Sequence, residues 1–168
     1  MKKLLCIAVL LMAVGKSFAQ TSAVSSCLAV TQDFYRWYGT TFTYSAALRK
    51  KSKLFSVTLR AALYADYAAA AKNPGEIVGL DWDPFLAAQD TVVLTARTAH
   101  IRNGSCFVDM FAPQEKEAHV VPELQRTGSI WIFTNFHYPA NGSTAPSDLL
   151  SALKHLKADR DRNPEIKK

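Results

Sequence analysis

The segment from Gly79 to Asp90 contains the residue types in this chain that are best suited to chemistry. Within twelve positions it carries three carboxylates, an indole and an amide, which are Asp81, Asp83, Asp90, Trp82 and Gln89. Converging carboxylates can hold a cation, and calcium takes about six to eight oxygen ligands. The spacing lacks the glycine-containing loop of a known calcium site, so we assign no metal and no cofactor. We expect either a shaped structural junction or one wall of a ligand pocket.

The structural interpretation of this segment is the favoured one. Asp83 followed by Pro84 is a strong helix start, because Asp caps free backbone N–H groups and Pro suits the first helical position. Trp82 is expected to bury its ring and to need an acceptor for its indole N–H. Gln89 can hydrogen-bond a neighbouring loop, and Asp90 leads into the first strand.

A second candidate group lies in the run from Ser129 to Tyr138. Trp131 and His137 alternate with Phe133 and Asn135, which places all four on one face of a regular strand. A histidine and an aspartate at the mouth of a cavity can act as general acid or base; a partly exposed strand histidine is the favoured alternative. No recognised nucleophile setting, phosphate loop or zinc spacing is present, and we assign no catalytic residue. The candidate ligand-binding residues are Asp81, Trp82, Asp83, Gln89, Asp90, Trp131 and His137.

The first nineteen residues have the form of a bacterial signal peptide. Lys2 and Lys3 precede an apolar run over 4–14, and the small residues Ser17 and Ala19 occupy the positions that a signal peptidase inspects. We therefore expect cleavage after Ala19 and a periplasmic or secreted product. The apolar run is shorter than the ~20 residues that cross a bilayer, and no later segment approaches that length.

The cysteines leave two alternatives. Cys6 belongs to the leader, so Cys27 and Cys106 are the pair in the mature chain, and an oxidising compartment favours a disulfide between them. The sequence before Cys27 also looks like a lipobox, which would make the chain a lipoprotein anchored at Cys27. A dozen polar or small residues separate that box from the apolar run, so the disulfide is preferred.

Length and charge indicate one domain and argue against nucleic acid as a partner. Removing 1–19 leaves 168 − 19 = 149 residues, and the three lysines lost with the leader reduce the net charge to 17 − 14 = +3. The basic clusters lack the interleaved aromatic residues of single-strand binders. We expect a single domain over 20–160 and a polar tail over 161–168.

The periodicity of the chain changes near residue 90. Helical spacing predicts helices over 24–38 and 56–71, the second ended by Asn73-Pro74-Gly75. After Asp90, alternation predicts strands over 91–100, 105–112, 117–125 and 129–138, with hairpin turns at Asn103-Gly104 and Thr127-Gly128. Pro122 indicates that the third strand is an edge or is bulged there. A last helix is predicted over 148–157, and the arrangement is α+β: N-terminal helices on a curved antiparallel sheet of about four strands, with a C-terminal helix.

Three motifs together resemble one family. They are Phe34-Tyr35-Arg36-Trp37-Tyr38, Asp81-Trp82-Asp83-Pro84-Phe85 with Gln89-Asp90, and Ser129-Ile130-Trp131-Ile132. The chain is similar to the bacterial envelope family catalogued as domain of unknown function 3828. That resemblance implies a cone-shaped fold like that of nuclear transport factor 2, and it implies no reaction.

The favoured function is an exported, non-enzymatic binding or accessory module that uses the concave face of its sheet. Its partner would be an envelope protein or a small ligand, and an immunity-type inhibitor of a secreted toxin is one special form. The alternative is a small-pocket enzyme with an Asp or His general base, which requires a carboxylate buried beside apolar walls.

Overall fold

A computed structural model describes residues 22–24, 26–74, 76–139 and 147–163. The signal peptide and cleavage site expected within 1–19 lie outside these residues. A helix over residues 26–38 comes first. The later elements are α2 (Tyr44–Lys50), η1 (Ser52–Leu54), α3 (Val57–Lys72), β1 (Thr95–Arg102), β2 (Ser105–Phe111), β3 (Val121–Thr127), β4 (Ile130–His137) and α4 (Leu149–Arg162).

The four strands form one antiparallel sheet in the order β1-β2-β3-β4, so the predicted α+β class is confirmed. The β1–β2 turn is Asn103-Gly104, where φ is 52° and 82°, and the β3–β4 turn contains Gly128 at φ 62°. Positive φ at these positions is what the Asn-Gly and Gly turn signals require. The boundary between the helical half and the strand-rich half lies between α3 and β1, as the change of period near residue 90 predicts.

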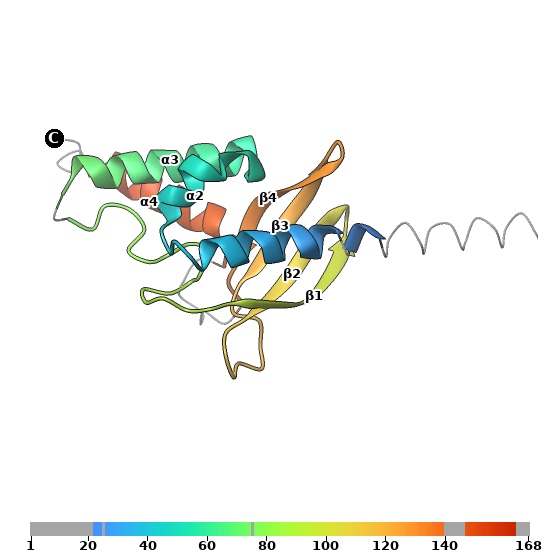
Figure 1. The fold of residues 1–168 in the computed structure, drawn as a ribbon. Helices are drawn as coiled ribbons and strands as arrows, with labels where there is room; N and C mark the ends of the chain where they lie inside the picture. The colour runs from blue at the N-terminus through green and yellow to red at the C-terminus, as the bar shows by residue number, and fades with distance from the viewer. Residues whose placement is uncertain (1–21, 25, 75, 140–146, 164–168) are drawn as a thin grey trace, which may run out of the picture.

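Helices cover one face of the sheet, called here the inner face, which carries Cys106, Val108 and Met110. The N-terminal helix lies across this face, while α2, α3 and α4 gather at one end of the sheet (Figure 1). All three inner-face side chains are fully buried. An aromatic cluster fills the space between helix and sheet. Its members are Phe34, Tyr38, Phe55, Phe85, Phe133 and Phe136.

A disulfide joins the N-terminal helix to β2. Cys27 and Cys106 are bonded, with their Cα atoms 6.6 Å apart and a sequence separation of 79. The predicted pair is therefore present. Closing a loop of that length stabilises a fold by about 3–5 kcal/mol in the chain-entropy account.

The third strand differs from its prediction in both bounds and position. It begins at Val121 and pairs with both β2 and β4, so the edge alternative for Pro122 is wrong. The β2–β3 ladder ends at Glu123, because Pro122, the residue before it in β3, has no N–H to donate. A register shift towards β4 lies between Glu123 and Leu124, next to the proline, but its extra residue is Thr134 of β4, so β3 itself is not bulged at Pro122.

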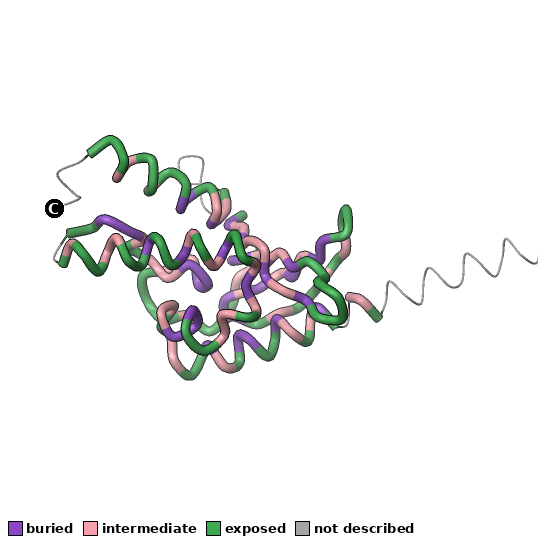
Figure 2. The backbone as a smooth tube through the Cα atoms, turned by 90° about the horizontal axis from the view of Figure 1, so that it is seen from above, coloured by how far each residue is buried: buried purple, intermediate pink, exposed green. Residues whose placement is uncertain are grey.

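Two helical features were not predicted. α2 and η1 occupy the basic stretch before α3, and α4 continues past its predicted end at Lys157 to Arg162. The extension has a physical cause, because Arg160 forms an ion pair with the buried Asp66 of α3 and so holds the last turns against that helix. The two helices run side by side (Figure 2).

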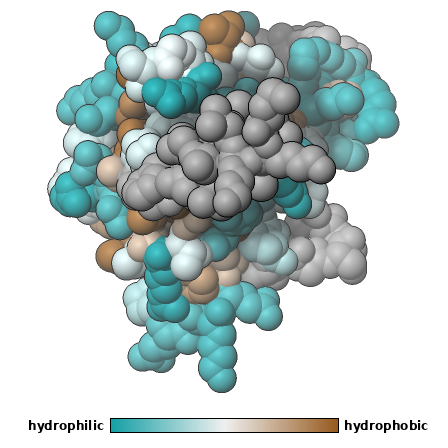
Figure 3. Space-filling model, turned by 90° about the vertical axis from the view of Figure 1, so that its right-hand side faces the viewer, coloured by the Kyte–Doolittle hydropathy of each residue, from teal (hydrophilic) through white to brown (hydrophobic). Residues whose placement is uncertain are grey.

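Within the described ranges, none of the helices combines the length and the apolarity needed to traverse a membrane. At the end of the molecule that Figure 3 faces, hydrophilic side chains dominate and hydrophobic ones form only small patches.

Candidate functional site

The Asp81–Asp90 segment is a tight turn inserted into the core. Asp83 Oδ1 accepts the backbone N–H groups of Phe85 and Leu86 at 2.9 and 3.1 Å, which is the capping role predicted for it. The structure that it caps is a turn over 84–87 instead of a helix. The Asp83 N–H donates to the Ala88 carbonyl at 2.8 Å and closes the base of the turn.

Three tyrosine hydroxyls hold this turn in place. Tyr35 donates to the Phe85 carbonyl at 2.7 Å, Tyr138 donates to the Pro84 carbonyl at 2.9 Å, and Tyr38 donates to Asp83 Oδ2. Two of these tyrosines come from the N-terminal helix and the third from the end of β4. The turn thereby connects both halves of the fold.

Burial shifts the ionisation of these groups. Burial is the main cause that raises the pKa of Asp83, and the hydrogen bonds from Tyr38, Phe85 and Leu86 offset part of that rise. Burial also raises the pKa of Tyr35, Tyr38 and Tyr138, and the nearby Asp83 carboxylate raises each further. The three phenols therefore remain neutral donors. Asp83 meets part of the predicted description of a catalytic carboxylate, yet its oxygens are already occupied by the protein.

The other polar residues of the segment do not join Asp83. Asp81, Gln89 and Asp90 are exposed. Trp82 is half-buried, with its ring edge-on to Tyr138 at a centroid distance of 4.9 Å. The acceptor expected for its indole N–H is not found among the described residues. The described residues also contain no group of three or more Asp, Glu, His or Cys side chains arranged to hold a metal ion.

Trp131 lies on the inner face and is closed off from solvent. Its side chain is 5% exposed, and its indole N–H donates to Ser26 Oγ of the N-terminal helix at 2.9 Å. The same helix is held over this face by the disulfide from Cys27. The face expected to bind a ligand is thus occupied by the protein's own helix.

His137 lies on the opposite, outer face, so the predicted shared face with Trp131 and Phe133 is wrong. Thr134 is an additional residue opposite the Glu123–Leu124 step of β3, and a one-residue bulge reverses the facing of every side chain beyond it. Phe133 and Phe136 are consequently both buried, while Asn135 and His137 are turned outward.

The outer face carries a polar row around Glu123. Its carboxylate accepts from Ser105 Oγ at 2.8 Å and contacts His137 Nε2 at 3.0 Å. Beyond His137, Asp148 caps α4 by accepting the Ser151 N–H at 3.0 Å. Burial alone would raise the pKa of Asp148, but hydrogen bonds from Asn135 and Ser151 and the charge of His137 outweigh it and lower that pKa. Each member of the row is engaged by another, which indicates a structural role.

The chain directly after the tight turn is very different. Residues 91–94 are extended, and within the described ranges no hydrogen bond joins their backbone to another backbone group. Alternation of exposure is already strand-like: Val92, Leu94 and Ala96 face inward and Val93 is 64% exposed. This segment leads into β1, which among the described residues pairs only with β2 and so forms an edge of the sheet.

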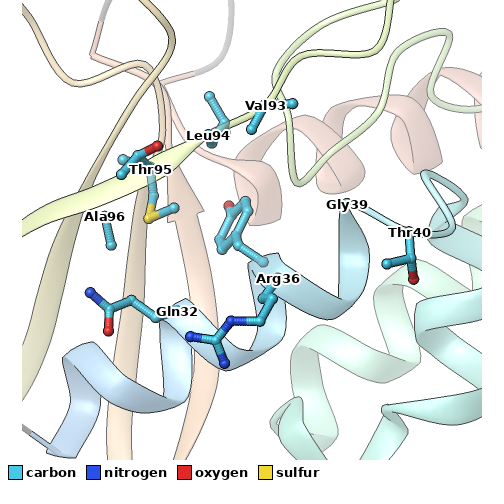
Figure 4. A pocket seen from close by; sticks show the side chains of 10 residues that line it. Gln32, Arg36, Gly39, Thr40, Val93, Leu94, Thr95 and Ala96 are labelled. Atoms are coloured by element: carbon cyan, nitrogen blue, oxygen red, sulfur yellow. The ribbon is translucent and has the colours of Figure 1, made fainter.

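A groove of about 490 Å³ runs beside this edge. Gln32 and Arg36 extend from the N-terminal helix on one side of it, and Val93 to Ala96 form the other side (Figure 4). Arg36 is exposed and forms an ion pair with Asp33 at 2.6 Å. The groove opens to solvent beside the edge, so an extended chain has access to it.

Sequence reasoning missed this groove and the Asp66–Arg160 ion pair. Arg36 lies within the aromatic helix motif, and the uncharged run over 91–96 was noted only as part of a strand. The signal in the sequence was that residues 91–96 carry no charge, although they belong to the first predicted strand, which is an edge of a meander. Helical spacing puts Asp66 on the same side as Leu59 and Leu63, and a buried carboxylate implies a cationic partner.

Comparisons of this chain with protein-family models, with curated proteins and with solved structures gave no match. The resemblance to the envelope family and its cone-shaped fold stays a prediction.

Proposed function

We propose that this chain is an exported, non-enzymatic binding module that takes an extended segment of a partner protein along its free sheet edge. The observation that carries the proposal is the run over 91–96 beside the groove. Its neighbour in sequence, the tight turn, has its polar groups satisfied, whereas residues 91–94 offer backbone donors and acceptors to a partner strand. Addition of such a strand is a common mode of peptide recognition.

The pattern of charge along the edge supports a binding role for this part alone. Native proteins protect edge strands with charges and bulges. Here the register shift between Ala96 and Thr98 places a bulge at Arg97, which is itself charged. His100 and Arg102 add further basic side chains along β1. Residues 91–96 read Thr-Val-Val-Leu-Thr-Ala and carry no such protection. An unprotected β-prone segment is a hazard unless a partner covers it.

Other segments contact the opposite edge of the sheet at two points. The Ser56 N–H donates to the Phe133 carbonyl of β4 at 2.8 Å, and the backbone N–H of Tyr138 donates to the Ser147 carbonyl at 2.9 Å. These contacts leave β1 as the edge available to a partner. The concave face, which the sequence favoured for binding, is filled by the N-terminal helix, so the proposal places the partner at the edge.

The contacts of Asp83 and His137 favour this proposal over a small-pocket enzyme. Both side chains are held by neighbours within the fold, in the turn and in the outer-face row respectively. An inhibitor of a secreted toxin remains one special form of the binding module.

The proposed location is the periplasm or the exterior, without a lipid anchor. A disulfide is typical of oxidising compartments, and the bonded sulfur of Cys27 is not free for acylation. Protein purified after export should show no free thiol under denaturing conditions and no lipid mass. Two free thiols, or an acylated N-terminal cysteine, would contradict this.

A photo-cross-linking residue at position 93 tests the partner site in the native envelope, with position 57 as the matched control. Val93 and Val57 are both exposed valines, at 64% and 74%, on different elements. We expect one defined adduct from position 93 and none from 57. The cross-linked peptide, made synthetically, should bind wild type and the Val57→Lys variant alike, and the Val93→Lys variant at least tenfold more weakly. Equal effects of the two lysines would contradict the edge site. A dimer that Val93→Lys dissociates would show instead that the edge pairs with a second copy.

A further inference from the structure

We infer that the groove between α3 and α4 is a separate site for a single-chain anionic amphiphile, such as a fatty acid or a lysophospholipid monomer. Two adjoining hollows of about 340 and 430 Å³ run along this helix pair. They share Ala65, Lys157 and Arg160, so they form one continuous groove. It lies at the end of the molecule away from the β1 edge and does not depend on the proposed partner site.

The floor of the groove is apolar at one end. Ala62 and Ala65 of α3 face Leu150 and Leu153 of α4 there. The alanines of α3 leave room between the helices because their side chains end at Cβ. α3 buries only Leu59, Leu63 and Asp66 along its sixteen residues, so much of its alanine surface remains uncovered. A hydrocarbon chain lying on this floor would be stabilised there, because its apolar surface would be removed from water.

The middle of the groove is cationic, and its cation is fixed in position. Arg160 lines both hollows, and its Nη1 donates to Asp66 Oδ1 at 2.8 Å and to the Val78 carbonyl at 3.0 Å. Asp66 is 1% exposed, and its other oxygen accepts the Leu80 N–H at 3.0 Å, so the carboxylate anchors the guanidinium from behind. The Arg160 side chain is 12% exposed, and the guanidinium N–H groups that these two acceptors leave unused can bind a carboxylate or phosphate at the groove.

Two lysines extend the positive charge along the rim. Lys154 lies at the apolar end and Lys72 at the far end, and within the described ranges neither has an ion-pair partner. Lys157 pairs with Asp161 at 2.5 Å. An apolar floor that leads to an anchored arginine with additional cations matches a ligand with a hydrocarbon tail and an anionic head. Charge complementarity therefore selects an anionic amphiphile over a neutral one.

Calorimetric titration of the exported protein with dodecanoate, below its micelle concentration, tests this inference. We expect one-to-one binding, binding of dodecanol at least tenfold weaker, and no binding of butyrate or inorganic phosphate. Lysophosphatidylglycerol should compete with dodecanoate, which tests whether phosphate and carboxylate heads share the site.

Two matched pairs of variants locate the site. Ala65→Trp fills the groove and should weaken dodecanoate binding at least tenfold, whereas Ala61→Trp, an exposed alanine of the same helix outside the groove, should leave it unchanged. Lys154→Glu should weaken binding more than Lys50→Glu, which makes the same change in net charge on α2. The folded state of each variant is checked by its far-ultraviolet circular dichroism.

Several outcomes would overturn the inference. Equal affinity for dodecanoate and dodecanol would show that no anion is recognised, and equal binding by the two tryptophan variants would place the site elsewhere. Absence of dodecanoate binding to the wild-type protein would also refute it. Binding to phosphatidylglycerol vesicles without any binding of monomers would mean that the cations serve a membrane surface.

Discussion

Two neighbouring stretches of the chain, 83–88 and 91–96, differ in how far their polar groups are hydrogen-bonded within the fold. The first is a turn held by an aspartate cap and three tyrosine hydroxyls, with Phe85 fully buried at its tip. The second is an extended edge whose residues 91–94 make no backbone hydrogen bond within the described ranges. The contrast indicates a division of labour, because a rigid turn fixes where the edge begins and leaves that edge open to a partner.

The tip of the turn should be the most sensitive position. Phe85 contacts the rings of Phe34, Tyr38, Phe55 and Phe136 at centroid distances of 5.0 to 5.4 Å. Phe85→Ala should lower the free energy of unfolding by about 3–5 kcal/mol, because it leaves a cavity in a packed aromatic cluster. Urea unfolding measures it, with Val93→Ala as the edge control, expected within about 0.5 kcal/mol of wild type. Similar losses at both positions would refute the contrast.

The cap of the turn should rank next. Asp83→Ala removes the acceptor of two N–H groups and leaves the buried Tyr38 hydroxyl without its partner. Together these should cost about 2–4 kcal/mol of the free energy of unfolding. Asp83→Asn keeps an acceptor oxygen and should cost less than about 1 kcal/mol. If both substitutions cost the same in urea unfolding, the turn requires the charge itself.

The raised pKa of Asp83 predicts a specific dependence of stability on pH. Because the folded protein retains this proton to higher pH than the unfolded chain, the contribution is complete below the ordinary aspartate pKa of about 3.9. It is lost as pH rises through the folded pKa. The free energy of unfolding of wild type should therefore fall relative to that of Asp83→Asn between pH ~3.9 and the folded pKa. Parallel pH profiles for the two proteins would contradict the shift.

The smallest effects should lie between the two stretches. Gln89 and Asp90 are exposed, and Gln89→Ala and Asp90→Ala should each change the free energy of unfolding by less than about 0.5 kcal/mol. A loss above 1 kcal/mol in thermal or urea unfolding would show that this connection belongs to the turn. Hydrogen exchange should meanwhile find the amides of 91–94 fast and those of Phe85 and Leu86 slow.

Much of the fold was accessible from local signals. Asn103-Gly104 fixes a hairpin because few residues adopt positive φ, and Ser56 caps α3 by accepting the Leu59 N–H at 3.2 Å. The capping role of Asp83 followed from the same chemistry. The candidate site was less accessible, because Trp131 and His137 were assigned to one face by counting along a strand, and that count fails at a bulge.

The sequence by itself indicated the long helices, the four strands, the hairpin turns and the favoured cysteine pair, because dihedral preference, period and composition act over a few residues. Only the tertiary structure decided which surfaces remain open. The bulge at Thr134 turned His137 outward, the N-terminal helix filled the inner face, and Asp66 met Arg160 across 94 residues of sequence. These outcomes depend on contacts between distant segments, whose packing and hydrogen bonds no local pattern encodes.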